Sequence, residues 1–411
     1  MHTDIAPPLA DDPRAQAAAQ ILKKCVHCGF CLATCPTYNL LGDEQDSPRG
    51  RIYLIKQVVE GHEPSRSTLN HLDRCLTCRN CETTCPSGVE YGHLVDTGRS
   101  LVEEQVPRGL GERWLRKGIL SVLPYTRRVG PLVRMGQYAR PLLPAKLAES
   151  IPLRQQPKPV PDRGHARSIL VLDGCVQPSM APATNASAAR VLDAFGIEQR
   201  KAGNAGCCGA VHFHLNEQDK ARDFMRRNID AWWPDIERGC EAIVSTASGC
   251  GVMLKDYGHA LADDPQYADK ARRVSELSRD IVEVLLDVLK DKDVSAYQPA
   301  AAAMGKVAFH APCTLQHGQK LPMVTESLLR RFGFSLVPVA DAHTCCGSAG
   351  TYSIFQPELS RKLRDKKVSN LLASEPDIIA TANIGCQLHI QSGSGRVVKH
   401  WIELIDELVC Q

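Results

Sequence analysis

The stretch Cys25-Val-His-Cys28-Gly-Phe-Cys31-Leu-Ala-Thr-Cys35-Pro36 recurs further along the chain as Cys75-Leu-Thr-Cys78-Arg-Asn-Cys81-Glu-Thr-Thr-Cys85-Pro86. In both stretches the cysteines are separated by two, two and three residues, and a proline follows the last one. This spacing is typical of proteins with two 4Fe–4S clusters, in which three cysteines of one run bind one cluster and the fourth binds the other. The predicted ligands are Cys25, Cys28, Cys31 and Cys85 for the first cluster, and Cys75, Cys78, Cys81 and Cys35 for the second.

Zinc sites and disulfides are the competing interpretations of these eight cysteines. A zinc ribbon uses two pairs of ligands, which does not account for two four-cysteine runs that each end in proline. The chain has 18 cysteines in 411 residues, and its start has no apolar core of the kind found in a secretory signal. We therefore expect a cytoplasmic protein, in which cysteines serve metal binding or redox chemistry rather than disulfides.

The overall composition excludes several classes of function. Lys plus Arg number 49 and Asp plus Glu number 46, so the net charge of +3 gives no reason to expect a nucleic-acid partner. No run approaches the ~20 apolar residues that span a bilayer. We expect a chain of ordinary globular composition that folds into several domains.

Residues 1–105 are expected to form a helical ferredoxin-type domain around the two cluster loops. Helices are predicted over 13–24, from Pro48 to Gly61 with Ser47 as N-cap, from about Ser67 to Cys75, and from Tyr91 onward. Basic residues also surround the loops. They are Lys23, Lys24, Arg49, Arg51, Arg74 and Arg79. These charges either raise the cluster potentials or are solvated surface groups.

Residues 106–165 are expected to form a basic helical connector that proline-rich sequence ends. Nine Arg and Lys between Arg108 and Lys146 alternate with apolar residues such as Trp114 and Leu120. Such a segment can pack its apolar side on the protein, contact a partner subunit, or lie on an anionic membrane surface. The sequence leaves these three interpretations open.

The second half of the chain is duplicated, with copies at 166–300 and 301–411. Cys175, Cys207-Cys208-Gly209 and Cys250 in the first copy recur as Cys313, Cys345-Cys346-Gly347 and Cys386 in the second. The first two offsets are equal, since 313 minus 175 and 345 minus 207 both give 138, and the third, 386 minus 250, gives 136. Regular offsets of this size indicate two similar domains.

Each copy shows an α/β pattern, because short apolar runs alternate with helical segments. The runs Ile169–Leu172, Ala242–Val244, Val307–Phe309 and Ile378–Ala380 are predicted to be buried parallel strands. The predicted fold class is thus α+β and multidomain: a helical two-cluster domain followed by two α/β cysteine-rich domains. Ligands of parallel sheets lie at the carboxyl ends of strands, which is where the repeated cysteines fall.

The repeated cysteines form a second candidate site. It comprises Cys175, Cys207, Cys208, Cys250, Cys313, Cys345, Cys346, Cys386 and His389. Metal binding or thiol redox chemistry is the functional interpretation, and packing of buried, metal-free cysteines is the structural alternative. No catalytic residue is predicted.

The chain resembles a known family. The Cys-Cys-Gly repeats resemble the cysteine-rich domains of heterodisulfide reductase, and also those found in anaerobic glycerol-3-phosphate dehydrogenase and in lactate-utilisation proteins. Together with four further stretches, the two cysteine runs resemble the iron–sulfur subunit of bacterial glycolate oxidase (glycolate dehydrogenase). These stretches are Pro48-Arg-Gly-Arg-Ile-Tyr-Leu-Ile-Lys56, Asn228-Ile-Asp-Ala-Trp-Trp-Pro234, Thr246-Ala-Ser-Gly-Cys-Gly251 and Thr381-Ala-Asn-Ile-Gly-Cys386. The full Cys-x-x-Cys ending of the repeat is absent, because Met253 and His389 occupy its last position.

This resemblance implies an electron-transfer subunit that receives electrons from a flavin-bearing partner subunit, on which glycolate is oxidised to glyoxylate. The electrons would pass through two 4Fe–4S clusters to a quinone or another acceptor. The repeats would hold zinc, a further iron–sulfur cluster, or no metal. No Gly-rich dinucleotide fingerprint is present, so no flavin or NAD is expected on this chain. The expected location is cytoplasmic, with peripheral contact at the inner membrane as an option.

Three alternatives accompany this hypothesis. The chain could be the equivalent subunit of a lactate or glycerol-3-phosphate dehydrogenase. The Cys-Cys-Gly half could be a catalytic site for disulfide or quinone reduction, as in heterodisulfide reductase. It could also be a docking platform without redox chemistry.

Overall fold

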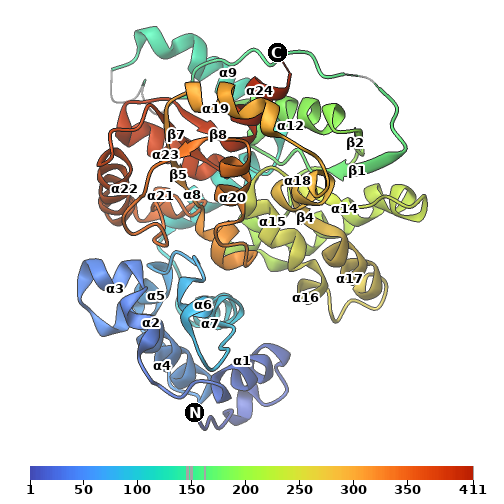
Figure 1. Cartoon of the computed structure of the whole chain (residues 1–411). Coiled ribbons are helices and arrows are strands. Elements are labelled where there is room, and N and C mark those ends of the chain that lie inside the picture. Colours follow the sequence, from blue (N-terminus) through green and yellow to red (C-terminus); the bar gives the residue numbers. More distant parts are fainter. Residues whose placement is uncertain (145–147, 149–150, 162, 411) are drawn as a thin grey trace. The chain divides into compact units, whose positions relative to one another are not determined.

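The computed structural model describes residues 1–144, 148, 151–161 and 163–410, so part of the predicted connector lies outside the described residues (Figure 1). The chain forms two compact units. Unit 1 comprises Met1–Lys117 and His343–Lys367, and unit 2 comprises Gly118–Ala342 and Val368–Gln411. A segment of the second repeat therefore belongs to the same unit as the two cysteine runs of the N-terminal part.

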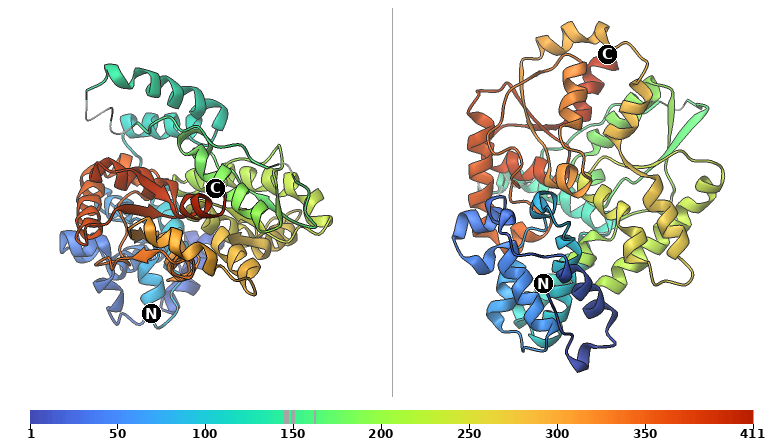
Figure 2. Two further views of the ribbon diagram at one scale, coloured as in Figure 1. Left: turned by 45° about the horizontal axis from the view of Figure 1, so that its top comes forward. Right: turned by 60° about the horizontal axis from the view of Figure 1, so that its bottom comes forward.

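Unit 1 is helical, as expected. Its N-terminal helices are η1 (Pro7–Leu9), α1 (Pro13–Lys23), α2 (Phe30–Ala33), α3 (Pro36–Leu41), η2 (Glu44–Asp46), α4 (Pro48–Val59), α5 (Arg66–Asp73), α6 (Asn80–Thr84) and α7 (Tyr91–Gln105). Three more helices contribute all or part of their length: α8 (Leu110–Val122), α21 (Tyr352–Phe355) and α22 (Pro357–Leu372). The N-terminal part of the chain, blue to light blue, consists of helices and loops in both views of Figure 2.

The longer helices of unit 1 enclose one apolar core. Leu22 of α1, Ile55 of α4, Leu72 of α5 and Leu94 of α7 are all fully buried in it. Helix α4 begins where its sequence predicts, because the Ser47 hydroxyl accepts a hydrogen bond from the Gly50 N–H at 3.0 Å. These helices hold the two cysteine loops at their ends.

Unit 2 contains two four-stranded sheets, and every strand pairing in them is parallel. The first sheet has the order β2 (Ile197–Arg200), β1 (Arg167–Val171), β3 (Ile243–Ser245), β4 (Ser278–Asp280). The second has the order β6 (Ser335–Leu336), β5 (Lys306–His310), β7 (Ile378–Thr381), β8 (Val398–His400). The identical orders confirm the predicted duplication. The predicted strands are the two central ones of each sheet, and the edge strands were not predicted.

Helices separate these strands. In the first copy they are α11 (Gln177–Met180), α12 (Pro182–Ala194), α13 (Ala210–His214), α14 (Gln218–Glu237), α15 (Ser248–Lys255), α16 (Tyr257–Ala260), α17 (Ala268–Leu277) and α18 (Ile281–Leu289). In the second copy, unit 2 has η4 (Ser295–Tyr297), α19 (Gln298–Ala303), η5 (Thr314–Gly318), α20 (Val324–Arg331), α23 (Ile384–Ser394) and α24 (Trp401–Val409). Helix α9 (Thr126–Ala139) and η3 (Arg140–Leu142) precede both copies.

The two sheets of unit 2 share one apolar core. Val244 of the first sheet and Val307 of the second belong to the same buried cluster. The C-terminal helix α24 packs on α12 of the first copy, so the two lie side by side in Figure 1 although they are far apart in sequence. Buried polar groups join them, because Arg190 Nε donates to Asp406 Oδ1 at 2.8 Å and Ser187 Oγ donates to Asp406 Oδ2 at 2.9 Å.

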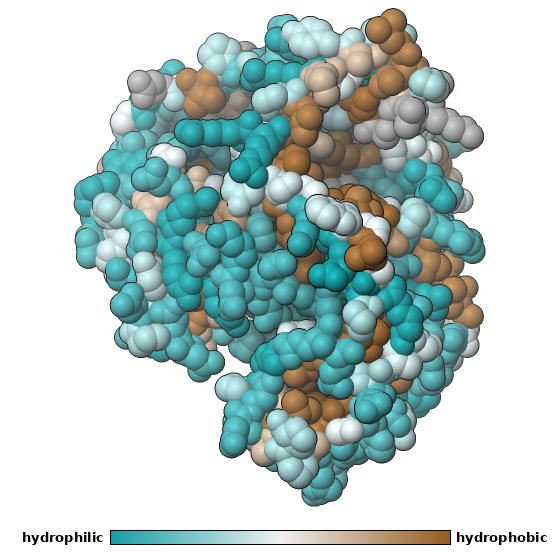
Figure 3. All heavy atoms as spheres, turned by 180° about the vertical axis from the view of Figure 1, so that it is seen from behind, coloured by the Kyte–Doolittle hydropathy of each residue, from teal (hydrophilic) through white to brown (hydrophobic). Residues whose placement is uncertain are grey.

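Helix α9 exposes apolar side chains. Val129 is buried, whereas Met135 is 63 % exposed and Tyr138 is 72 % exposed. Brown side chains gather at the upper right of Figure 3, in the region of α9. Packing on the described part of the protein therefore does not cover this face. Across the described residues, none of the helices combines the length and the apolar character that spanning a bilayer requires.

The Arg190–Asp406 pair allows a test of how the two copies depend on each other. Asp406→Ala leaves the buried guanidinium without its carboxylate, so we expect the free energy of unfolding to fall by about 3–5 kcal/mol. Glu241→Ala removes the partner of Arg167 in an exposed pair and should cost less than about 1 kcal/mol. Urea unfolding of both variants measures the difference, and equal effects would contradict a shared, interdependent core.

Candidate functional site

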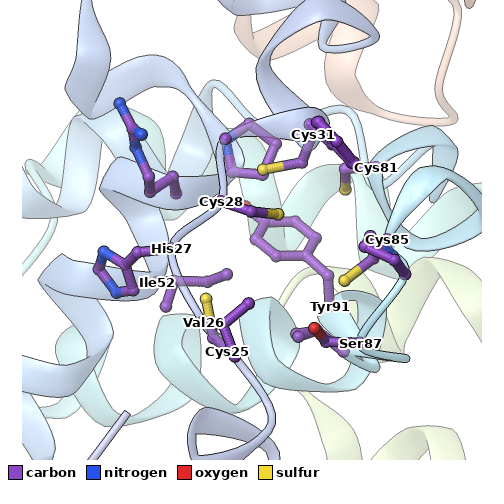
Figure 4. A pocket seen from close by; sticks show the side chains of 16 residues that line it. Cys25, Val26, His27, Cys28, Cys31, Ile52, Cys81, Cys85, Ser87 and Tyr91 are labelled. Carbon is purple, nitrogen blue, oxygen red and sulfur yellow. The ribbon is translucent and has the colours of Figure 1, made fainter.

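The first candidate metal site is a pocket of unit 1 lined by both cysteine loops. Cys25, Cys28 and Cys31 line it from the first loop, and Cys81 and Cys85 line it from the second. Figure 4 shows the labelled cysteines around a common space, with the Tyr91 ring beside it. Cys25, Cys28, Cys31 and Cys85 are the residues predicted to bind the first cluster.

The four thiols of this predicted set are close enough to influence one another. Burial raises the pKa of Cys31 to about 11, and the neighbouring Cys25, Cys28 and Cys85 also act to raise it. Thiolates repel one another, so several of them in one place require a nearby positive charge. The first pocket is thus suited to a cationic metal centre.

The second pocket of unit 1 lies against the other four cysteines. Cys35 lines it from the first loop, and Cys75, Cys78 and Cys81 line it from the second. Burial raises the pKa of Cys81 far above its ordinary value, and Cys78, Cys75 and Cys35 raise it further, as does Cys31. The influence of Cys31 on Cys81, together with the presence of Cys81 in both pockets, indicates that the two sites adjoin.

Both loops reach this geometry through the same backbone conformation. His27 and Thr77, each just before the second cysteine of a run, have left-handed φ angles of 55° and 51°. Gly29 and Arg79, each just after that cysteine, have φ angles of 87° and 58°. These turns bring the sulfur atoms of each loop together. Arg79 adopts a conformation that glycine favours, so the second loop depends on its surroundings to hold it.

The second site is surrounded by a buried polar network. Arg51 is 1 % exposed, and its guanidinium donates to Asp46 Oδ1 at 3.3 Å and to the His71 carbonyl at 2.7 Å. Asp46 also accepts from Arg74 at 2.9 Å. Arg51 is therefore a buried charge whose electrostatic neighbours include Cys75 and Cys35, and the solvated-surface interpretation is wrong for it. Lys24, in contrast, forms an exposed pair with Glu90.

The residues of the two pockets fit 4Fe–4S clusters. Five cysteines line the first pocket and four line the second, with Cys81 in both, so each pocket contains the four sulfurs that such a cluster binds. All 18 cysteines, each within the described residues, are free of disulfides. The sulfurs are thus available to a metal.

The first repeat brings its four cysteines into contact. Cys175 follows β1, Cys207 and Cys208 lie before α13, and Cys250 lies on α15. A hydrogen bond between the Cys175 and Cys207 thiols raises the pKa of Cys175, and burial raises it further. The Cys208 thiol forms hydrogen bonds with the thiols of Cys207 and Cys250. The bond with Cys250 and burial raise the pKa of Cys208 well above its ordinary value. The four thiols are neighbours in a row, of which Cys175, Cys207 and Cys208 are buried and Cys250 is partly exposed. This arrangement is compatible with neutral packing and with metal binding.

Two residues that sequence reasoning missed hold this loop. The Asn228 amide accepts from the Gly206 N–H and donates to the Cys207 carbonyl, both at 2.9 Å. The Tyr257 hydroxyl donates to the Cys208 carbonyl at 2.9 Å. Asn228 lies within a stretch quoted for its family resemblance, but nothing in that stretch indicated its role.

The second repeat divides its candidate residues between the two units. Cys313, Cys386 and His389 lie in unit 2, where the Asn383 side chain donates to Cys386 Sγ at 3.6 Å. Cys345 and Cys346 are buried in unit 1, where the Gly347 N–H donates to Cys345 Sγ at 3.4 Å. Gly347 has a φ angle of 90°, and a Cβ there would lie 2.5 Å from the Ser360 carbonyl oxygen. Glycine is therefore required in this loop.

Comparison with known proteins supports both halves of the site. Residues 21–89 match the family 4Fe-4S dicluster domain. Residues 169–255 and 307–391 each match the family Cysteine-rich domain.

Several relatives match the chain. It is 52 % identical over 408 residues to "Glycolate oxidase iron-sulfur subunit" of Escherichia coli (strain K12), covering 99 % of both chains. It is 32 % identical over 406 residues to "Probable glycolate oxidase iron-sulfur subunit" of Bacillus subtilis (strain 168), covering 91 % of this chain and 89 % of that protein. "Lactate utilization protein A" of Exiguobacterium sp. is 28 % identical over 244 residues, covering 58 % of this chain and 96 % of that protein.

A buried histidine links the cysteine-bearing ends of the two sheets. His400 ends β8 and caps α24, because its Nδ1 accepts from the Ile402 N–H at 3.2 Å. Its Nε2 lies 2.9 Å from the Thr246 carbonyl, to which it donates. Thr246 lies shortly before Cys250. Both contacts use the neutral imidazole, and burial lowers the pKa of His400 to about 4.

This histidine should make stability depend on pH. The unfolded side chain titrates near 6.5, so the contribution of His400 is fully present above pH 6.5 and is lost as the pH falls toward 4. The predicted loss attributable to this group is about 3 kcal/mol at most. His400→Asn keeps the cap but cannot be protonated. Urea unfolding at pH 7.5 and pH 5 should show a smaller pH effect in the variant, and equal effects would refute this assignment.

Proposed function

We propose, from the premise that this chain belongs to the family of bacterial glycolate oxidase iron–sulfur subunits, that it transfers electrons from glycolate oxidation to an acceptor. Glycolate would be oxidised to glyoxylate on a flavin-bearing partner subunit. Two 4Fe–4S clusters in unit 1 would carry the electrons toward a quinone or another acceptor.

The observation that carries this proposal is the pairing of two cysteine-lined pockets in one unit. Eight cysteines with the spacing of a two-cluster ferredoxin line two adjoining spaces. Zinc bound in these pockets could stabilise the fold but could not transfer electrons, because zinc does not change its oxidation state. Two neighbouring redox sites are what a relay requires.

The residues of the chain would perform separate tasks in this relay. Cys25, Cys28, Cys31 and Cys85 would bind the first cluster, and Cys35, Cys75, Cys78 and Cys81 would bind the second. When bound, the clusters accept and release electrons one at a time, which lets a flavin that holds two electrons discharge in two steps. Ile52 and Tyr91 beside the first pocket would limit the access of water.

The partner is inferred from what this chain lacks in sequence and from the names of its relatives. No Gly-rich dinucleotide fingerprint occurs in the chain, so the flavin and the glycolate site are assigned to another subunit. The names of the E. coli and B. subtilis relatives favour glycolate over lactate, although lactate utilization proteins also match.

The surface of α9 is a candidate contact for the rest of the complex. It exposes Met135 and Tyr138 beside Arg127, Arg128 and Arg134, and it contains no acidic residue. A partner subunit or an anionic membrane surface on the cytoplasmic face of the inner membrane would suit this combination.

Metal analysis of the anaerobically purified chain tests the proposal. We expect about eight irons and eight sulfides per chain, as two 4Fe–4S clusters require. Cys28→Ser should remove one EPR signal of the reduced protein, and Cys78→Ser should remove another, because the two residues belong to different sets. Zinc, or iron beyond eight, that is lost in a Cys207→Ser or Cys345→Ser variant would assign a further metal to the repeats.

Cys410→Ser is the matched control, because Cys410 lies outside both cysteine patterns. It should leave the iron content and both signals unchanged. A wild-type protein that binds zinc and no iron at these pockets would contradict the proposed relay.

A further inference from the structure

The sulfur atom of Cys75 receives hydrogen bonds from two sides. The Thr77 N–H donates to it at 3.4 Å, and the Tyr91 hydroxyl donates to it at 3.8 Å. Among the described residues, the structure gives no such contact to the sulfurs of Cys25, Cys28, Cys31 or Cys85. The second pocket therefore has donors aimed at its ligands, and Cys75 is where they converge.

A second tyrosine of unit 1, contributed by the second repeat, carries a buried hydroxyl. Tyr352 of α21 is 7 % exposed, and its hydroxyl has no hydrogen-bond partner among the described residues. After burial, Cys75 has the largest electrostatic influence on this phenol, followed by Arg51 and Cys345. The Tyr352 side chain thus lies in the neighbourhood of a predicted cluster ligand and of the Cys-Cys-Gly loop at once. Figure 1 shows α21 as part of the red C-terminal repeat.

Direct contacts within unit 1 fix the segment that carries Tyr352. The Asn80 amide donates to the Thr34 carbonyl at 3.1 Å and to the His343 carbonyl at 3.2 Å. Thr34 precedes Cys35 and Asn80 precedes Cys81, so one buried side chain connects both cluster loops to the residues just before Cys345. The Arg116 guanidinium also lies 4.9 Å from the centre of the Phe355 ring, three residues beyond Tyr352.

A hydrogen bond to a cysteine sulfur changes the electron affinity of the cluster that the sulfur binds. The donor stabilises the negative charge that reduction adds, so it raises the reduction potential. Burial acts in the opposite direction, because a low-dielectric site disfavours added charge. A buried cluster site therefore depends on its donors, and the buried Tyr352 hydroxyl, which has no partner among the described residues, is available as one.

We propose that Tyr352 is a positioning residue of the second cluster site, whose hydroxyl, without a hydrogen-bond partner among the described residues, joins Tyr91 and Thr77 in donating to the Cys75 sulfur once the cluster is bound and raises the reduction potential of that cluster. This inference rests on the proposed function, since it requires a cluster at Cys35, Cys75, Cys78 and Cys81. It gives the second repeat a role in setting the reduction potential of the second cluster. This role does not depend on whether the cysteines of the repeat bind a metal.

A redox titration monitored by EPR tests this role in the full-length, cluster-loaded protein. Tyr352→Phe removes one oxygen atom and keeps the ring. We expect it to lower the potential of one EPR signal, the signal that Cys78→Ser removes, and to leave the other signal and the iron content unchanged. Tyr91→Phe should lower the same potential, because both hydroxyls act on Cys75.

Tyr53→Phe is the matched control, because Tyr53 of the same unit is 50 % exposed. It should shift neither potential. Resonance Raman spectra give a second readout, in which loss of a donor should raise the frequency of an iron–cysteine stretching band in Tyr352→Phe.

The outcomes separate the two proposals. Absence of iron from the wild-type protein would overturn the relay itself. Iron-loaded Tyr352→Phe protein with both potentials unchanged would overturn the role of Tyr352 alone. Loss of iron from this variant would also overturn it, because the hydroxyl would then serve folding rather than tuning.

Discussion

Mutual repulsion between crowded thiolates is the constraint on which unit 1 depends. The Cys31 thiol is influenced by the three other cysteines of the first predicted ligand set. The Cys81 thiol is influenced by the three other cysteines of the second set and, more weakly, by Cys31. Burial and like charge both oppose ionisation, so the apo loops favour neutral thiols. A metal cluster with positive iron reverses this preference and stabilises the fold in which the loops converge. The left-handed residues of both loops and the buried Arg51–Asp46 pair lie at this convergence.

Duplication explains the architecture of unit 2. Each copy provides a four-stranded parallel sheet, and residues of both sheets occur in one buried cluster. Leu170 and Ile243 of the first sheet belong to a separate cluster formed by residues of the first copy. In each copy, the residue that ends the fourth strand and caps the following helix also forms a hydrogen bond with the other copy. Gln319 of the second copy donates to Asp280, which caps α18, and His400 donates to Thr246 of the first copy while it caps α24. The cysteine-bearing strand ends are therefore part of the interface that holds the copies together.

Much of this arrangement could be predicted from sequence, and the failures have physical reasons. The cysteine spacing predicted two four-sulfur sets, and each set lines a pocket, although Cys81 lines both pockets. Apolar runs predicted the central strands β1, β3, β5 and β7. The edge strands were missed because Ile197–Arg200 and Ser335–Leu336 lack an apolar run. Tyr352 and Asn228 were missed because their roles arise from tertiary contacts, to which local spacing gives no guide. Arg51 resembles a surface charge in sequence, and only its burial beside Asp46 distinguishes it.

The two copies have diverged at positions that surround their cysteines. Gly209 approaches Ala221 as Gly347 approaches Ser360, so the helices α14 and α22 occupy the same register. Asn228 follows Ala221 by seven residues, and Lys367 follows Ser360 by seven. Lys367, which is 1 % exposed, therefore occupies in the second copy the position of Asn228, whose amide holds the Cys-Cys-Gly loop of the first. A buried ammonium group needs negative charge nearby, whereas the amide needs only hydrogen bonds. The second loop also belongs to the unit of the cluster pockets. The two copies therefore surround their Cys-Cys-Gly loops with different chemistry, a neutral amide in the first copy and a buried ammonium group in the second.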